Sequence, residues 1–130
     1  MSVLLKREYP ILSLVPNEDH TGKEGYAVKA NSTKAQLVTA DTDSPLGVVL
    51  DGGPTTGRTA VLLADCSQGT CRVKLDATPG TVVLGTYLTI TASATFKQAV
   101  STKTMCARAL EAGAASELIE AVLFRPVAAP

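Results

Sequence analysis

Short segments rich in Val, Leu and Thr, separated by turn-forming residues at intervals of about 8–12 residues, limit the fold of this chain more than any other feature. Val and Thr favour strands, whereas Gly, Pro, Asn and Asp mark turns. The expected strands are Tyr26–Ala30, Gln36–Thr39, Leu46–Leu50, Thr59–Ala64, Arg72–Leu75, Thr86–Thr91, Thr95–Ala99, Ala107–Leu110 and Ile119–Phe124. The pattern predicts a mostly β protein, built as a small β-barrel or β-sandwich-like domain.

The segment from residue 104 to 123 is ambiguous, because its Ala, Leu and Glu residues are good helix formers. An internal repeat argues for strands instead. With a shift of 60 residues, Leu50-Asp51-x-Gly53 falls on Leu110-Glu111-x-Gly113, and Val61-Leu62-Leu63 falls on Ala121-Val122-Leu123. A twofold repeat suits a closed or nearly closed barrel, which hides its sheet edges. We therefore expect strands here, with a short helix around 112–117 as the alternative.

The first 24 residues differ from the rest of the chain. Two apolar patches, Val3–Leu5 and Tyr9–Val15, precede a polar stretch without periodicity. The length of 130 residues suits one compact domain. We expect an extended N-terminal arm and hinge over residues 1–24 and a β-barrel-like domain over residues 25–130. An edge strand of the same domain is the alternative for the arm.

Charge and hydropathy narrow the possible partners. Lys+Arg and Asp+Glu are equal at 12 each, so clustered positive charge for a phosphate backbone or an anionic membrane is not indicated. No apolar run approaches the roughly 18–20 residues of a transmembrane helix, and Lys6, Arg7 and Glu8 interrupt any signal peptide. We expect no nucleic-acid partner, no membrane partner, and folding in a cytoplasm.

Candidate catalytic and metal-binding side chains are sparse. His20 is the single histidine and lies in the polar stretch, where we expect a solvated loop residue. Asp41 and Asp43 precede Pro45, where acids cap backbone amides. The loop Gly52–Gly57 lacks the Gly-Lys-Ser/Thr ending of a phosphate cradle. The sequence therefore predicts no enzyme activity, no catalytic residues, no cofactor and no metal.

The three cysteines do not form an even disulfide framework. Cys66 and Cys71 flank a four-residue turn, so a cross-strand disulfide is an alternative to free thiols, and a metal site would need further ligands. We expect Cys106 to be a small core residue.

The run from residue 25 to 126 resembles the small capsid decoration, or cement, proteins of tailed bacteriophages. The acidic turn and following strand, residues 40–49, match one element of that family, and Cys71–Leu75 matches its central strand. Residues 79–88 resemble its next strand entry, with Thr86-Tyr87 where Asp-Pro is common. Residues 106–113 with 117–123 resemble its closing hairpin, which is the most specific piece.

The resemblance implies a structural virion protein that binds the outer surface of an assembled phage head. It would stabilise the head by bridging neighbouring major capsid subunits, as a homotrimer on the capsid surface. An N-terminal arm commonly takes part in that contact. The candidate contact residues of the capsid or inter-subunit arm are Leu4, Leu5, Tyr9, Pro10, Ile11, Leu12 and Leu14.

Other functions are compatible with this sequence, and they differ in the binding partner. A head-fibre base or a tail accessory domain shares this composition. A small β-barrel ligand-binding module would need a pocket with perturbed acids or a buried histidine. A cellular adaptor would use its arm to add a strand to a partner sheet.

Overall fold

The computed structural model describes residues 11–64, 70–100 and 103–128 of the chain. These residues form strands and turns without a helix, so the expectation of a mostly β fold is confirmed. The strands are β1 (Ile11–Pro16), β2 (Ala27–Asn31), β3 (Lys34–Leu37), β4 (Gly47–Asp51), β5 (Thr59–Leu63), β6 (Cys71–Lys74), β7 (Tyr87–Ile90), β8 (Phe96–Gln98), β9 (Thr104–Ala109) and β10 (Leu118–Ala128). Each of the nine expected strands is present, and 104–123 forms β9, a turn and the start of β10.

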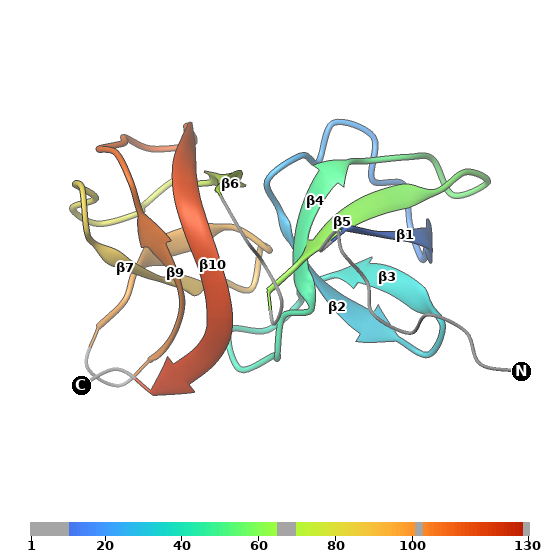
Figure 1. Cartoon of the computed structure of the whole chain (residues 1–130), viewed down its shortest axis with the longest axis horizontal. Coiled ribbons are helices and arrows are strands. Elements are labelled where there is room, and N and C mark those ends of the chain that lie inside the picture. Colours follow the sequence, from blue (N-terminus) through green and yellow to red (C-terminus); the bar gives the residue numbers. More distant parts are fainter. Residues whose placement is uncertain (1–10, 65–69, 101–102, 129–130) are drawn as a thin grey trace, which may run out of the picture.

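The strands make two sheets that lie side by side as two lobes (Figure 1). The first is a closed barrel in the order β1-β3-β2-β4-β5, completed by antiparallel pairing of β5 with β1. The second is a five-stranded sheet in the order β6-β10-β9-β7-β8. An isolated parallel bridge between Leu75 and Phe96 joins the β6 end of this sheet to β8. The second lobe therefore follows the path of the first and stops just short of a closed barrel.

The two lobes are copies of one fold, and their strand registers correspond pair by pair. From a residue of repeat 1 to its counterpart in repeat 2, the residue number rises by 60 in β2, β4 and β5, by 59 in β1, and by 61 in β3. The corresponding pairs are Val49↔Val61 and Ala109↔Ala121, Ala27↔Val48 and Tyr87↔Arg108, and Pro16↔Ala35 and Leu75↔Phe96. The predicted internal repeat is confirmed; we call the lobes repeat 1 and repeat 2.

Strand β1 is an integral part of repeat 1. It pairs with β5 on one side and, in parallel, with β3 on the other. Its counterpart in repeat 2 is β6, which pairs with β10 in the same way. Residues 11–16 are thus a barrel strand with a partner on each side and not an edge strand, and residues 1–10 lie outside the described residues. The contact role predicted for the arm stays a prediction.

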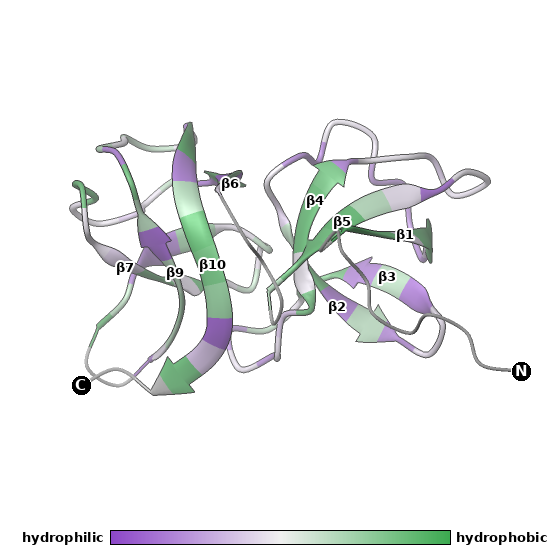
Figure 2. Ribbon diagram, viewed as in Figure 1, coloured by the Kyte–Doolittle hydropathy of each residue, from purple (hydrophilic) through white to green (hydrophobic). Residues whose placement is uncertain are grey.

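Each repeat has an apolar interior, and the strands that enclose it carry the most hydrophobic residues of the ribbon (Figure 2). In repeat 1 the interior holds Val28, Ala35, Val49 and Val61. Repeat 2 places larger side chains at two of the corresponding positions, where Leu88 and Phe96 are fully buried. At the other two positions Ala109 and Ala121 replace the valines, so Leu88 and Phe96 fill volume that valine side chains occupy in repeat 1.

The repeats are joined by a second apolar layer. In repeat 1, Ala27, Val48 and Leu62 alternate with the interior residues and point outward, yet all three are buried against repeat 2. The amide of Ala27 donates to the carbonyl of Ala94 at 2.8 Å, and the amide of Lys74 donates to the carbonyl of Gly25 at 3.0 Å. One continuous core therefore crosses the junction.

Candidate interaction surface

His20 is fully buried, so its prediction as a solvated loop residue is wrong. The loop after β1 folds back over the end of the barrel, and the His20 amide donates to the Gly53 carbonyl at 2.9 Å. The ring Nδ1 lies 2.9 Å from the Thr59 hydroxyl, and Nε2 lies 3.5 Å from Glu18 Oε1. An imidazole without exposed surface cannot reach a substrate. In this geometry His20 has a structural role.

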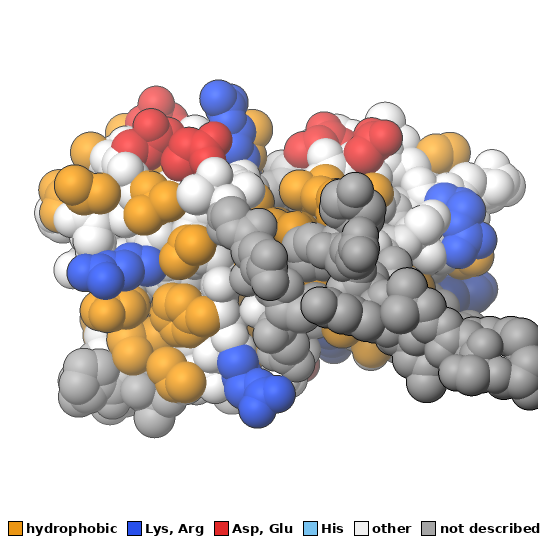
Figure 3. Space-filling model, in the orientation of Figure 1, with side chains coloured by type: hydrophobic (Ala, Val, Ile, Leu, Met, Phe, Trp, Pro, Cys, Tyr) orange, Lys and Arg blue, Asp and Glu red, His pale blue; other side chains and the backbone are white. Residues whose placement is uncertain are grey.

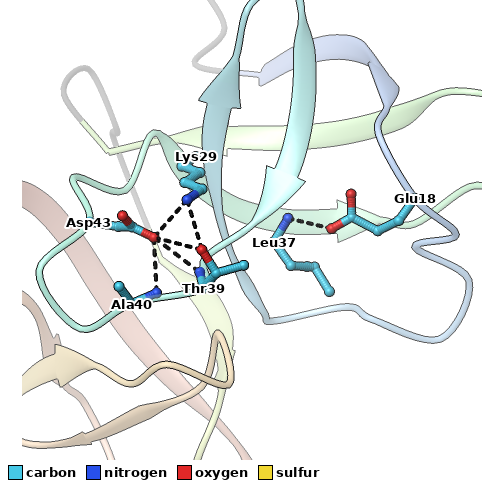
Figure 4. Close-up of polar contacts among 6 residues, drawn as sticks. All are labelled: Glu18, Lys29, Leu37, Thr39, Ala40 and Asp43. Atoms are coloured by element: carbon cyan, nitrogen blue, oxygen red, sulfur yellow. Dashed lines mark hydrogen bonds and ion pairs between the residues drawn. The ribbon is translucent and has the colours of Figure 1, made fainter.

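The carboxylate of Glu18 joins this loop to the barrel wall. Its Oε1 accepts a hydrogen bond from the amide of Leu37 at 2.7 Å (Figure 4). Leu37 lies two residues beyond Ala35, the last residue of β3 that pairs with β1, so the carboxylate satisfies a strand amide that has no ladder partner on that side. Glu18 Oε1 is therefore engaged within the fold, whereas the buried Oε2 has no hydrogen-bond partner among the described residues.

The acidic turn before Pro45 caps the backbone as predicted (Figure 4). Asp43 Oδ2 accepts hydrogen bonds from the amides of Thr39 and Ala40 and from Lys29 Nζ, each at 3.0 Å. The Lys29 ammonium and these amides lower the pKa of Asp43. Asp41 pairs instead with Lys103, which belongs to repeat 2, so the turn also ties the two repeats together.

The thiols of Cys71 and Cys106 are free and buried, and the expectation that Cys106 is a core residue is confirmed. Burial raises the pKa of each thiol to about 12. Cys66 lies outside the described residues. Thiols with such a pKa carry almost no thiolate at neutral pH and are poor nucleophiles.

The remaining sites considered for chemistry are taken up by internal contacts. The amide of Gly52 is hydrogen-bonded to Glu24 Oε2 at 3.0 Å, so this loop does not offer a free amide there to a phosphate. Within residues 11–64, 70–100 and 103–128, no cluster of three or more His, Cys, Asp or Glu is arranged to hold a metal ion. None of these described residues belongs to a helix that could span a membrane.

The predicted contact residues are divided by the structure. Leu4, Leu5, Tyr9 and Pro10 lie outside the described residues. Ile11 is exposed, Leu12 is half-buried, and Leu14 packs against the interior of repeat 1. On the outer side of β1, Val15 is exposed as well, and the sequence reasoning did not single it out.

An exposed apolar face lies on repeat 2, over β7, β9 and β10 (Figure 3). Tyr87 is 39% exposed and meets Phe124 edge to face, with 6.2 Å between ring centroids. The Arg108 guanidinium stacks over the Tyr87 ring at 5.0 Å and donates to the Gly85 carbonyl at 3.2 Å. Val122 is half-buried beside Arg108, its β-ladder partner. We call Tyr87, Arg108, Val122 and Phe124 the outer face.

The sequence reasoning missed the outer face. The strand registers align Tyr87 with Ala27 of repeat 1. The strand register of the repeat identifies the outer face, because its residues are the counterparts of the repeat 1 residues that pack against repeat 2.

The fold is thus a tandem pair of five-stranded units, one closed and one nearly closed. A solved structure with the same fold is the N base of the head fiber protein gp8.5 of bacteriophage phi29. The likeness has a TM-score of 0.62 at 14% sequence identity, and it covers 89% of this chain and 94% of that one. No family model and no curated protein matches the sequence.

Proposed function

We propose that this protein is a structural component of a bacteriophage virion that binds the outer surface of an assembled head. In this role it stabilises the head by bridging neighbouring major capsid subunits. The observation that carries the proposal is the likeness to the phi29 head fiber base, which extends over nearly the whole length of both chains. Because that likeness shows the fold alone, the function rests on combining it with the sequence and the surface.

The sequence resemblance to capsid decoration proteins independently supports a position on the phage head. Its elements coincide with elements of the fold: the acidic turn of residues 40–45 caps backbone amides just after β3, and residues 106–123 form the β9–β10 hairpin. A sequence pattern whose expected strands and turns coincide with strands and turns of the structure is stronger support than composition alone.

The surface suits a protein whose work is binding. Exposed apolar side chains occur on both repeats, with Ile11 and Val15 on β1 and Tyr87 on β7. Contact sites on two linked units allow one chain to touch two neighbouring subunits, and linked contacts bind more tightly than either alone. On this proposal the protein is made in the host cytoplasm and resides on the capsid surface as a homotrimer, without enzyme activity or a cofactor.

A head-fibre base is the second candidate, because the phi29 protein with the same fold is itself the base of a head fiber. Both candidates place the protein on the head. They differ in whether the bound protein bridges subunits or carries a projecting fibre, and in how much it strengthens the shell.

Co-sedimentation of the purified protein with expanded, undecorated phage heads tests the proposal. Saturable binding at a fixed ratio per capsomer is the expected result, together with increased resistance of the heads to heat. Binding without added resistance would favour a fibre base. A protein that stays in the supernatant at all concentrations would overturn both candidates.

A further inference from the structure

The outer face of repeat 2 occupies the same place in its fold as the face by which repeat 1 packs against repeat 2. The registers align Tyr87 with Ala27, Arg108 with Val48, and Val122 with Leu62. The three residues of repeat 1 are at most 6% exposed, because repeat 2 covers them. In repeat 2 the corresponding Tyr87 and Arg108 are exposed and Val122 is half-buried, on the face that Figure 3 shows.

What covers the face in repeat 1 is known from the structure. The cover is the side of repeat 2 where β6 approaches β8, including the turn between β7 and β8. Ala94 of that turn accepts the Ala27 amide, and Lys74 at the end of β6 donates to Gly25. The equivalent side of repeat 1 is the junction of β1 with β3 and the turn between β2 and β3. Val15 takes the position of Lys74 there, and the two turn residues Ser32 and Thr33 stand where repeat 2 has the three residues 92–94.

We propose that the outer face of repeat 2 binds the β1–β3 side of repeat 1 of a second copy of this chain. The contact repeats between molecules the arrangement that already joins the two repeats within one molecule. It is a head-to-tail contact, because two different surfaces meet, and such contacts produce closed rings or open filaments. The inference does not depend on capsid binding, since it concerns the free protein.

The chemistry of both surfaces agrees with this assignment. The outer face carries Tyr, Phe and Arg, the residue types that are enriched at the centres of protein interfaces. On the other surface, Val15 is 36% exposed on the outer side of β1, so an apolar side chain faces solvent where the intramolecular contact has its counterpart. An aromatic ring pair with a stacked guanidinium buries large area with few side-chain torsions to fix, which favours association.

The test uses two variants that each block one of the two surfaces. Tyr87→Lys places a charge beside Arg108 on the outer face, and Val15→Lys places one on the β1–β3 side. Ala115→Lys is the matched control, since Ala115 is exposed in the β9–β10 turn. It lies nine residues before Phe124 in the sequence, and the strand from residue 118 to 124 alone spans about 20 Å.

Solution mass is measured over a range of protein concentrations by sedimentation velocity. We expect self-association of the natural chain and of Ala115→Lys, and a rise of at least about tenfold in the dissociation constant for each blocking variant. Mixing Tyr87→Lys with Val15→Lys must then yield a 1:1 heterodimer, because each variant keeps the surface that the other has lost. This complementation separates a head-to-tail contact from a face-to-face one.

Three results would overturn the proposal: a natural chain that stays monomeric at every concentration, a loss of association in Tyr87→Lys alone, or a mixture that remains monomeric. Circular dichroism and thermal unfolding establish that each variant is folded. If Tyr87→Lys does not fold, Tyr87→Ser removes the ring without adding charge and is measured in its place.

Discussion

The imidazole of His20 lies 2.9 Å from the hydroxyl of Thr59, and both residues are without exposed surface. In repeat 2 the counterpart of Thr59 is Ile119, and the loop residue beside Gly113, the counterpart of Gly53, is Val82, whose carbonyl accepts from the Gly113 amide at 3.2 Å. One copy of the fold thus has a polar pair where the other has an apolar one. The buried ring Nε2 of His20 finds no hydrogen-bond partner among the described residues, which makes the Nδ1 contact its main anchor.

Replacing both members of this pair should cost less than the sum of the two single replacements. Thr59→Val leaves the imidazole without its partner and is expected to lower the free energy of unfolding by about 1–3 kcal/mol, since an unsatisfied buried polar group is costly. In the double variant His20→Val/Thr59→Val, the loss should fall below the sum of the single losses by about 0.5–3 kcal/mol. Urea unfolding of the four proteins measures this difference, and strict additivity would show that the contact has no energetic weight.

The glycines at equivalent positions of the two repeats should respond differently to alanine. Gly25 and Gly85 have φ of 87° and 92°, so both substitutions incur a backbone cost of about 1–2 kcal/mol. A Cβ at residue 25 would lie 2.9 Å from the amide nitrogen of Lys74, whereas at residue 85 it would meet only the Arg108 guanidinium at 3.6 Å.

Gly25→Ala is therefore expected to destabilise the protein by about 1–3 kcal/mol more than Gly85→Ala, because the two repeats must move apart. Gly85→Ala serves as the control for the backbone term. Equal losses in thermal unfolding would mean that the junction between the repeats yields at little cost.

The capped carboxylate of Asp43 should contribute stability that depends on pH. Its pKa is lowered in the folded protein, chiefly by the hydrogen bond from Lys29, so the contribution is present above the unfolded value of about 3.9. The contribution is lost as the pH falls through the lower folded value. Asp43→Asn should thus destabilise the protein at pH 7 and differ less from the natural chain at acid pH.

Unfolding by urea at pH 7 and at about pH 3 measures the difference for Asp43→Asn. Asp51→Asn, at an exposed position at the end of β4, is the matched control. A loss that is the same at both pH values would assign the effect to the amide substitution itself rather than to the charge.

The buried thiols should resist labelling until the protein unfolds. With a pKa of about 12, about one thiol in 10,000 is ionised at pH 8 for Cys71 or Cys106. A Cys66→Ser variant isolates these two residues. We expect no rapid labelling with a thiol-reactive dye in the native protein and two labelled residues in guanidinium. Rapid native labelling of either residue would place it at an accessible position.

The strands and the repeat could be predicted because they depend on local residue types. Val, Thr and turn residues mark the nine segments, and Leu50-Asp51-x-Gly53 against Leu110-Glu111-x-Gly113 gives the shift of 60 that the strand registers confirm. The shift also decided for strands over helix in residues 104–123. In this segment the ladder partners of β10 override the helix preference of alanine.

The features that escaped prediction depend on long-range packing. Strand β1 lies between two proline residues, Pro10 and Pro16, and its partner β5 is 45 or more residues away, so its membership of the barrel has no local signal. His20 sits in a polar stretch, and only the contact with Thr59 shows that it is enclosed. The outer face becomes visible only when the covered residues of repeat 1 are known.

The junction between the repeats lies within one polypeptide, and this has a consequence for assembly. Two free bodies lose about 4–15 kcal/mol of translational and rotational freedom when they associate. Because the chain itself connects β5 to β6, forming the contact of Ala27 with Ala94 loses only a small part of this freedom. The contact therefore persists at any dilution. A copy of the same contact between molecules would depend on the protein concentration. The protein would then be less associated when dilute in solution than when concentrated on a surface.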